Sequence, residues 1–112
     1  DLDLAEVHDC FTINQLLCVE AIGLSESGRA GYDFMSGKYD PDSDCPINLS
    51  GGLKSKGHPV GATGASMHAL VYKQLVGEPI GVAAKGNPEV AMTVNIGGSG
   101  VTNCVSVMRR LK

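Results

Sequence analysis

The segment that most constrains this fold covers residues 48–64 and has the sequence NLSGGLKSKGHPVGATG. Five of its seventeen residues are glycine. Glycine is favoured where a side chain would obstruct a turn, a ligand or neighbouring backbone, and a run so rich in glycine has no amphipathic face of its own. We therefore predict a loop that is pressed against another part of the molecule.

A helix is predicted to follow this loop over about residues 62–76. The small side chains of Ala62, Ala65 and Ala69 lie on one side of that helix. Because helices approach their neighbours more closely where the side chains are small, we expect this side to contact a sheet or a partner helix.

The first part of the chain predicts one strand and two helices. Residues 5–8 have the pattern of the end of a short strand. Thr12 and Gln15 have the spacing of a capping box, so a helix is expected from there to Gly23, a residue suited to end it. Residues 25–37 have room for one further short helix.

The last part of the chain predicts a β-hairpin. Residues 77–89 contain Pro79 and Pro88 and are expected to form a loop. Two runs rich in β-branched residues, 90–96 and 101–108, are joined by a glycine-rich turn.

The predicted order is β-α-(α)-loop-α-β-β, an α/β unit in which helices cover a mixed sheet that ends in the hairpin. Residues 1–112 have the length of one domain. They are too few for a complete doubly wound fold, and we interpret the chain as half of a larger unit. Because it begins with Asp1 and not with methionine, we also expect a trimmed or partial sequence.

Charge and composition argue against several classes of function. The formal net charge of −3 and the lack of a basic patch argue against nucleic-acid binding. No apolar run is long enough to span a membrane. The four cysteines have neither zinc-site spacing nor the density of a secreted disulfide scaffold. We expect free thiols in a reducing compartment, namely the cytoplasm of a bacterium or an archaeon, or a peroxisome or mitochondrion in a eukaryote.

Chemically active residues are expected at the end of the first strand, where His8, Asp9 and Cys10 stand together. Strand ends hold reactive groups because the scaffold fixes the backbone while the side chain stays accessible. If the strand continues through Cys10, its side chain lies on the same face as that of His8. A thiol can accept and return a proton near neutral pH, and the equally weighted alternative is that Cys10 is a small buried hydrophobic residue.

His58 is the second candidate, because Pro59 restricts the backbone and biases His58 toward an extended conformation. A rigidly held imidazole suits a general base or an oxyanion donor, and the alternative is a turn histidine bonded to local backbone. The segment lacks the ending of a phosphate-binding loop. A metal site of His8, Cys10 and His58 has no support from ligand spacing, so no metal is expected. His68, Cys18, Cys45 and Cys104 are interpreted as structural.

The sequence of residues 48–64 resembles the NxxGGxxxxGHPxGxTG signature of thiolases. HDCF at residues 8–11 resembles the motif of the sterol-carrier-protein-type branch, where most other thiolases have Asn-Glu-Ala-Phe. The two motifs occur in the family's order and are followed by the glycine-rich hairpin, so the resemblance covers nearly the whole chain. It implies the C-terminal half of the thiolase fold.

The resemblance also implies a role for each matching residue. In that family a cysteine of the N-terminal half attacks the acyl thioester, and the acyl group then passes to coenzyme A or to an enolate. His58 would activate that cysteine and donate to the thioester oxygen. Cys10 would move the α-proton of the substrate, and His8 would help to polarise the same oxygen in the first oxyanion hole. Gly97 matches the glycine whose N–H contributes to the second oxyanion hole, and Asp9 is expected to support these residues without reacting.

One departure from the family concerns the acid/base residue. Most thiolases carry a Cys-x-Gly motif on the penultimate strand, and here the stretch is Asn95-Ile96-Gly97. Asparagine cannot shuttle a proton. The role would fall to Cys10, as in the sterol-carrier-protein-type branch, whereas Cys104 is expected to lie too far along the last strand.

A second departure is that residues 1–112 contain neither the nucleophile motif nor the region that grips coenzyme A. The chain alone is therefore expected to be inactive and to need an N-terminal thiolase half, from the same or a separate chain. The resemblance further implies acyl-CoA as substrate, no covalently bound cofactor, and a homodimer or tetramer.

Three other functions remain open at this point. One is a thiolase-like aldolase or a coenzyme-A-binding subunit without thiolytic activity. Another is a Cys/His hydrolase with Cys10 as nucleophile and His58 as base. The last is a structural domain without chemistry.

Overall fold

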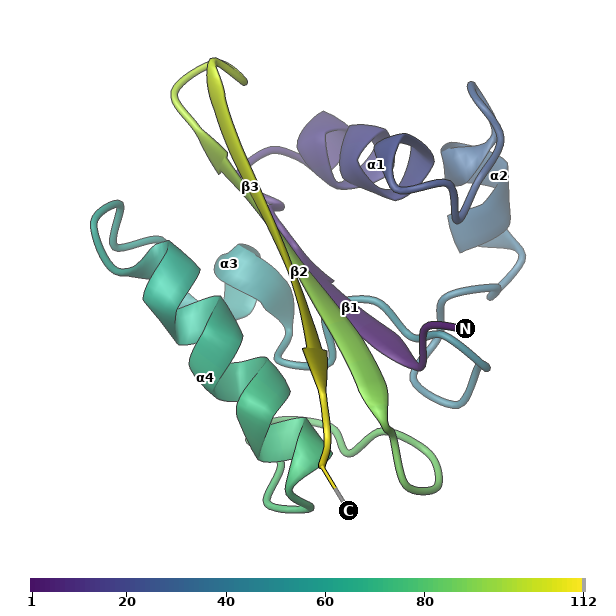
Figure 1. Cartoon of the computed structure of the whole chain (residues 1–112). Coiled ribbons are helices and arrows are strands. Elements are labelled where there is room, and N and C mark those ends of the chain that lie inside the picture. Colours follow the sequence, from purple (N-terminus) through teal and green to yellow (C-terminus); the bar gives the residue numbers. More distant parts are fainter. Residues whose placement is uncertain (112) are drawn as a thin grey trace.

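A computed structural model of the chain describes residues 1–111. The elements follow one another in the order β1-α1-α2-α3-α4-β2-β3 (Figure 1). Their bounds are Leu4–Val7 for β1, Thr12–Ala21 for α1, Ala30–Met35 for α2, Gly52–Lys56 for α3, Thr63–Leu75 for α4, Val90–Gly97 for β2 and Thr102–Arg109 for β3.

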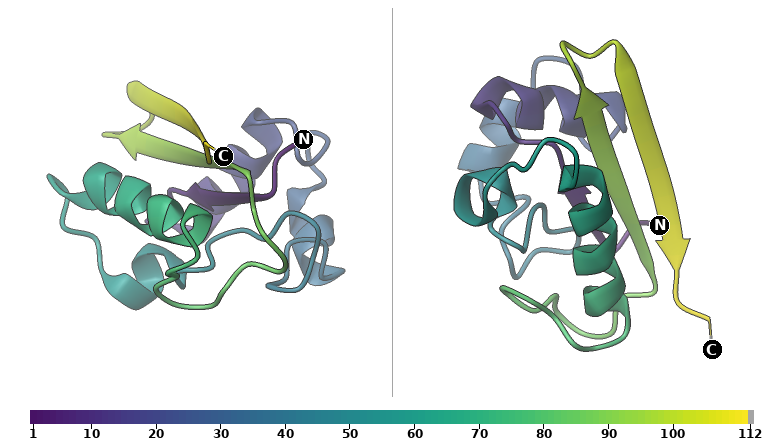
Figure 2. Two further views of the ribbon diagram at one scale, coloured as in Figure 1. Left: turned by 60° about the horizontal axis from the view of Figure 1, so that its bottom comes forward. Right: turned by 90° about the vertical axis from the view of Figure 1, so that its left-hand side faces the viewer.

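The three strands form one mixed sheet in the order β1-β2-β3. β2 lies in the centre, pairs in parallel with β1 and pairs in antiparallel with β3. Figure 2 shows β3 beside β2 at the free edge of the sheet. The predicted α/β fold with a mixed sheet and a terminal hairpin is confirmed, and each hairpin strand begins or ends within one residue of its predicted bounds.

Helices cover the two faces of the sheet, with α1 and α2 on one side and α4 on the other (Figure 1). Alternate residues of β1 point to opposite faces, so Ala5 and Val7 join the core under α1 while Leu4 joins the core under α4. The core under α1 comprises Ala5, Val7, Cys18, Val19, Ala30, Tyr39, Ile47 and Val94. The core under α4 comprises Leu4, Val71, Leu75 and Ala91.

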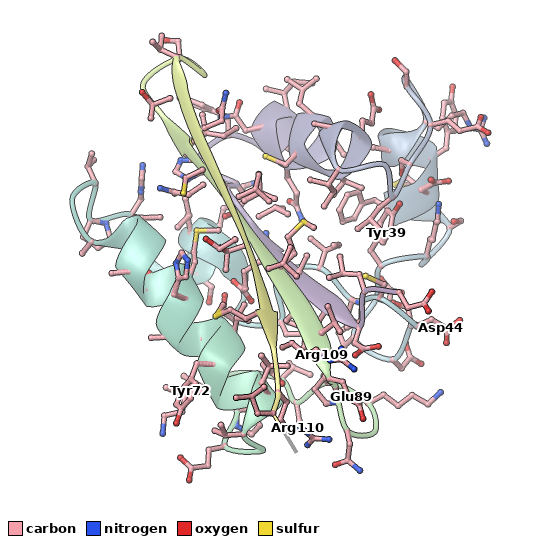
Figure 3. All side chains as sticks on the ribbon, in the orientation of Figure 1. Tyr39, Asp44, Tyr72, Glu89, Arg109 and Arg110 are labelled. Atoms are coloured by element: carbon pink, nitrogen blue, oxygen red, sulfur yellow. The ribbon has the colours of Figure 1, made fainter. Side chains whose placement is uncertain are left out.

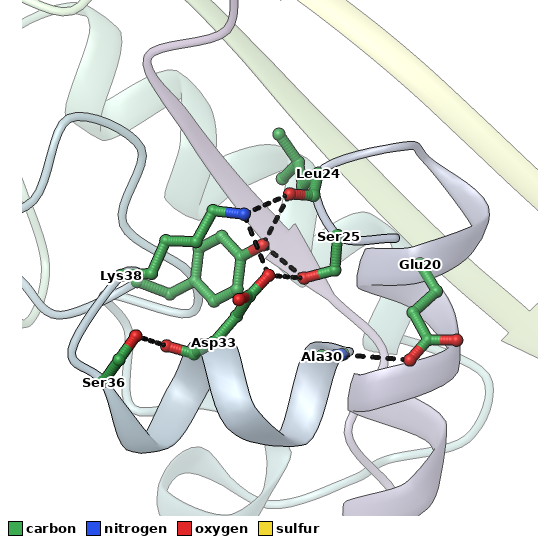
Figure 4. Close-up of polar contacts among 8 residues, drawn as sticks. Glu20, Leu24, Ser25, Ala30, Asp33, Ser36 and Lys38 are labelled. Atoms are coloured by element: carbon green, nitrogen blue, oxygen red, sulfur yellow. Dashed lines mark hydrogen bonds and ion pairs between the residues drawn. The ribbon is translucent and has the colours of Figure 1, made fainter. Parts of the chain in front are cut away.

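A cluster of polar contacts fixes α2 against the end of α1 (Figure 4). The carboxylate of Glu20 accepts hydrogen bonds from the backbone N–H groups of Gly28 and Ala30, at 3.0 and 3.1 Å. Ser25 donates to Asp33 at 2.6 Å, and Lys38 forms an ion pair with the same carboxylate at 2.9 Å. The hydrogen bond from Ser25, followed by that from Lys38, lowers the pKa of Asp33.

Two local expectations were wrong. Thr12 does not cap α1, because Phe11 is the N-cap residue and the Thr12 hydroxyl instead accepts a hydrogen bond from Lys54 Nζ at 3.0 Å. The glycine-rich segment is not entirely a loop, because residues 52–56 form the short helix α3. Its N-cap, Gly51, has a φ of 87°, a left-handed conformation that glycine adopts without strain.

Several apolar side chains remain exposed in the described chain. Figure 3 shows Tyr72 on the side of α4 that faces away from the sheet. Ala65 and Ala69 on α4 are also exposed, so the small-residue side of this helix is not its contact with the sheet. Val105 and Val107 on β3 are 52% and 61% exposed. Apolar surface of this extent is what a larger assembly would cover. None of the helices within residues 1–111 is long and apolar enough to cross a membrane.

Glu6 connects β1 to the glycine-rich segment from a buried position. Its side chain is only 3% exposed, and its carboxylate accepts hydrogen bonds from the N–H and the hydroxyl of Ser50 at 3.0 and 2.6 Å. Burial raises the pKa of this carboxyl group, although the two bonds from Ser50 act in the opposite direction. The native state therefore holds the Glu6 proton more tightly than the unfolded chain does.

We predict that the free energy of unfolding falls as the pH rises from the ordinary carboxyl range, near 4.5, through the raised pKa of Glu6. Over this interval the native state carries more protons at Glu6 than the unfolded state, so deprotonation favours unfolding. Urea unfolding of the wild-type chain and of Glu6→Gln at a series of pH values measures this effect. In the Glu6→Gln variant, the free energy of unfolding should fall less over this pH interval than in the wild-type chain. An equal decline in both proteins would contradict the prediction.

Candidate active site

His8 lies immediately beyond β1, at the carboxyl end of the sheet where α/β proteins hold their reactive groups. Its backbone N–H donates to Val94 O at 2.9 Å, which extends the pairing with β2 by one residue. Its side chain is buried, at 3% exposure, and Nδ1 lies 2.9 Å from Oδ1 of Asn95. With the Asn95 amide in this orientation its oxygen can only accept, so His8 donates from Nδ1.

The imidazole ring of His58 contacts that of His8. The centroids of the two imidazole rings are 4.9 Å apart and the rings stand at 85° to each other. Nδ1 of His58 lies 2.7 Å from Oγ1 of Thr63, at the start of α4. His58 is exposed, whereas Thr63 is buried. The structure thus brings together His8, His58 and Asn95, which come from three separate parts of the sequence.

Asp9 joins the end of β1 to the glycine-rich segment. The carboxylate is buried, and Oδ1 accepts a hydrogen bond from the backbone N–H of Leu53 at 2.7 Å. Gly52, with a φ of 67°, lies so close that a Cβ at this position would overlap the Asp9 carboxylate. This contact places the loop that ends at His58 beside His8.

Strand periodicity predicted that Cys10 and His8 would lie on one face if the strand continued through Cys10, and it does not continue that far. β1 ends at Val7, so the alternation that would align Cys10 with His8 does not reach it. The half-buried thiol lies just before α1, where its sulfur accepts a hydrogen bond from Asn14 Nδ2 at 3.1 Å. Cys10 therefore lies close to His8 in sequence, but its side chain is held by Asn14 of α1.

Asn95 and Gly97 lie at the carboxyl end of β2. Gly97 is the last residue of the strand and pairs with Thr102 of β3. Asn95 faces the start of α4, where a Cβ on Gly64 would lie 3.0 Å from Asn95 Nδ2. Glycine at position 64 therefore allows α4 to approach Asn95 closely.

Cys104 lies nearer to the site than expected. It is the direct partner of Asn95 in the β2–β3 register, so the two side chains share one face of the sheet. The expectation that Cys104 lies too far along the last strand was therefore wrong. The short turn between the strands fixes this register, and counting outward from Gly97 and Thr102 would have revealed the pairing.

Cys18 and Cys45 are poor candidates for chemistry. Cys18 is buried, and its sulfur lies 3.9 Å from the carbonyl oxygen of His8. Burial raises the pKa of the Cys18 thiol. Burial, with a smaller effect of Asp3, raises the pKa of Cys45 to about 11.

Sequence reasoning missed two parts of the site. Thr63 belongs to the TG pair of the glycine-rich signature, but spacing alone did not indicate that it binds His58. The backbone N–H of Leu53 as the partner of Asp9 has no sequence signal, because any residue except proline offers it. Within residues 1–111 no group of three or more His, Cys, Asp or Glu side chains is arranged to hold a metal ion.

Comparison with protein families gives a match over residues 1–110 to the family described as "Thiolase C-terminal domain-like". The chain is 49% identical over 110 residues to an acetyl-CoA acetyltransferase of Methanothermobacter thermautotrophicus, covering 98% of this chain and 28% of that protein. It is 43% identical over 97 residues to sterol carrier protein 2 of Oryctolagus cuniculus, covering 87% of this chain and 18% of that protein.

A third relative is the benzoylsuccinyl-CoA thiolase subunit BbsB of Thauera aromatica. The identity is 37% over 98 residues, which cover 88% of this chain and 26% of that subunit. The chain thus spans less than a third of the length of each of these three relatives.

The contact between Asp9 and Gly52 predicts an unequal effect of two glycine substitutions. Gly52→Ala should destabilise the chain by about 3 kcal/mol, because a left-handed alanine costs about 1–2 kcal/mol and the buried Asp9–Leu53 hydrogen bond is also disturbed. Gly28→Ala is the matched control, because Gly28 has a φ of 76° with nothing within 4 Å of its Cβ position. It should cost only about 1–2 kcal/mol. Equal losses in urea unfolding would show that Asp9 does not constrain Gly52.

Proposed function

The chain belongs to the thiolase C-terminal domain family, and on that premise we propose that it forms the C-terminal catalytic half of a thiolase. The enzyme transfers acyl groups between coenzyme A thioesters, by 3-ketoacyl-CoA thiolysis or by Claisen condensation. The observation that carries this proposal is the His8–His58 pair at the carboxyl end of the sheet, with each Nδ1 held by a side chain.

His58 acts first as the base in this proposal. Its Nδ1 is bound by Thr63, no hydrogen bond is recorded at its Nε2 among residues 1–111, and the residue is exposed. His58 accepts the proton of a cysteine thiol supplied by the other half of the enzyme. The resulting thiolate attacks the thioester carbon, and the charge that develops on oxygen is met by fixed donors.

His8 and Gly97 supply such donors. The Asn95 contact at Nδ1 aims the His8 ring and leaves Nε2 as the nitrogen for the substrate oxygen. The N–H of Gly97 belongs to the second oxyanion hole. Each donor of this kind is worth about 3 kcal/mol in the transition state.

Cys10 moves the α-proton. In condensation its thiolate removes this proton and the enolate carbon attacks the acyl enzyme, and in thiolysis the thiol returns the proton to the departing enolate carbon. Asn95 stands where most thiolases have the acid/base cysteine, and an amide cannot perform this transfer. The hydrogen bond from Asn14 Nδ2 holds the Cys10 sulfur in place at the start of α1.

The nucleophile and most of the coenzyme A contacts come from an N-terminal half, in the same or a separate chain. This is consistent with the small share of each relative that the chain spans. The exposed apolar side chains on α4 and β3 are available for such contacts. The complete enzyme assembles as a dimer or tetramer.

The central prediction concerns three variants of the complete enzyme. His58→Ala should lower kcat for acyl transfer by about 10²–10⁴-fold, the usual contribution of a general acid or base. Cys10→Ala should still form the acyl enzyme but should lose exchange of the substrate α-proton with solvent deuterium. Cys104→Ala, which removes the thiol opposite Asn95, is the matched control and should retain exchange. Normal thiolysis by Cys10→Ala would contradict the assignment of α-proton transfer to Cys10. Loss of exchange in Cys104→Ala would assign this transfer to Cys104.

Alkylation tests the alternative in which Cys10 is the nucleophile of a hydrolase. At pH 8 we expect iodoacetamide to modify the exposed Cys104 readily, and Cys45 and Cys18 slowly. A thiol of pKa about 11, as at Cys45, is only about 0.1% thiolate at that pH, and Cys18 is buried. Peptide mass spectrometry over time gives the rate for each cysteine. A Cys10 no faster than buried Cys18 excludes the hydrolase, and a Cys10 faster than Cys104 supports it.

A further inference from the structure

The contact between the side chains of Thr63 and His58 takes no part in the proton transfers proposed above. Thr63 is the first residue of α4 and is 1% exposed. Its Oγ1 lies 2.7 Å from Nδ1 of His58 and 3.1 Å from the carbonyl oxygen of Pro59. One buried hydroxyl therefore stands between an imidazole nitrogen and a backbone carbonyl.

The single hydroxyl hydrogen decides the direction of both hydrogen bonds. A carbonyl oxygen can only accept, so the Thr63 hydroxyl donates to Pro59. With that bond made, the oxygen of Thr63 has only lone pairs left for His58, so Nδ1 of His58 carries the proton. In the other neutral tautomer the Thr63 hydroxyl would have to donate to Nδ1 and give up its bond to Pro59.

From this geometry we propose that Thr63 is a positioning residue that holds the proton of neutral His58 on Nδ1 and keeps Nε2 free as the base. The inference rests on the function proposed above. When Nε2 takes the thiol proton of the nucleophile, the imidazolium keeps its Nδ1–H on Thr63 and gains an Nε2–H that points to the substrate oxygen. The same acceptor thus serves both states of His58, and the ring need not turn between the two steps.

The turn before α4 gives Thr63 the rigidity that this role requires. The carbonyl oxygen of Pro59 also accepts from the backbone N–H groups of Ala62 and Thr63, at 2.8 and 2.9 Å. Threonine is β-branched, which restricts χ1, and burial leaves its methyl group little freedom. The hydroxyl is therefore fixed by both the backbone and the core.

The test uses the complete enzyme with ¹⁵N-labelled histidine. The wild-type protein at high pH should show His58 with a pyrrole-type Nδ1 and a pyridine-type Nε2. Thr63→Val keeps the shape but removes the acceptor, and it should give a mixture of tautomers and a kcat lower by about 10–100-fold with KM within about twofold. Thr63→Ser restores the hydroxyl and should restore both the single tautomer of His58 and the wild-type kcat. Ser66→Ala removes a nearby hydroxyl on α4 that does not touch His58 and should change neither.

The outcomes separate this inference from the proposed function. A wild-type His58 with its proton on Nε2 overturns the role of Thr63, even if Thr63→Val fails to fold. An unchanged tautomer and kcat in Thr63→Val also overturn it. Absence of thiolysis in the wild-type enzyme overturns the proposed function instead, because the nitrogen signals do not depend on turnover.

Discussion

Buried hydrogen bonds between side chains and backbone hold the glycine-rich segment against β1, and the site depends on them. Leu49 and Leu53 of this segment are buried, but a glycine-rich run offers few such side chains, so hydrophobic burial contributes little to its placement. Asn48 accepts from the N–H of Val7 at 2.7 Å, and Glu6 and Asp9 accept from the N–H groups of Ser50 and Leu53. Each bond satisfies a backbone donor that burial would otherwise leave unpaired. These bonds determine where the loop ends and therefore where His58 stands.

The two histidines have different surroundings that match different tasks. His8 is enclosed, with its backbone in the sheet register and its ring on Asn95. His58 is exposed, its Nδ1 is bound by Thr63 after the Pro59 turn, and its ring contacts that of His8. An enclosed ring suits a fixed donor, and an exposed ring can reach a group on another half. The site is thus enclosed at His8, on the side of the sheet, and exposed at His58.

Sequence patterns predicted those elements whose side chains alternate or repeat over several residues, such as the hairpin and α4. They did not predict α3, because a five-residue helix that begins at a left-handed glycine has too few residues to show a period. The capping box at Thr12 was wrong because Thr12 is already the first residue of α1 and Phe11 is the N-cap, while the threonine hydroxyl binds Lys54. His8, Cys10 and His58 were chosen as candidates from their local sequence, and Asn95 and the role of Gly97 came from the resemblance. The contacts of these residues depend on register and on backbone donors that no side-chain pattern records.

The wide spacing of the site along the chain has a consequence for folding. His8 and Asn95 are 87 residues apart, and so are the strands that carry them, whereas Asp9 and its partner Leu53 are only 44 apart. Contacts between distant residues form slowly, because a long loop must close first. At about 5–20 residues per second, ribosomal synthesis separates the emergence of His8 from that of Asn95 by about 4–17 s. The glycine-rich segment can therefore dock onto β1 on the ribosome, while the contact of His8 with Asn95 forms only when β2 arrives.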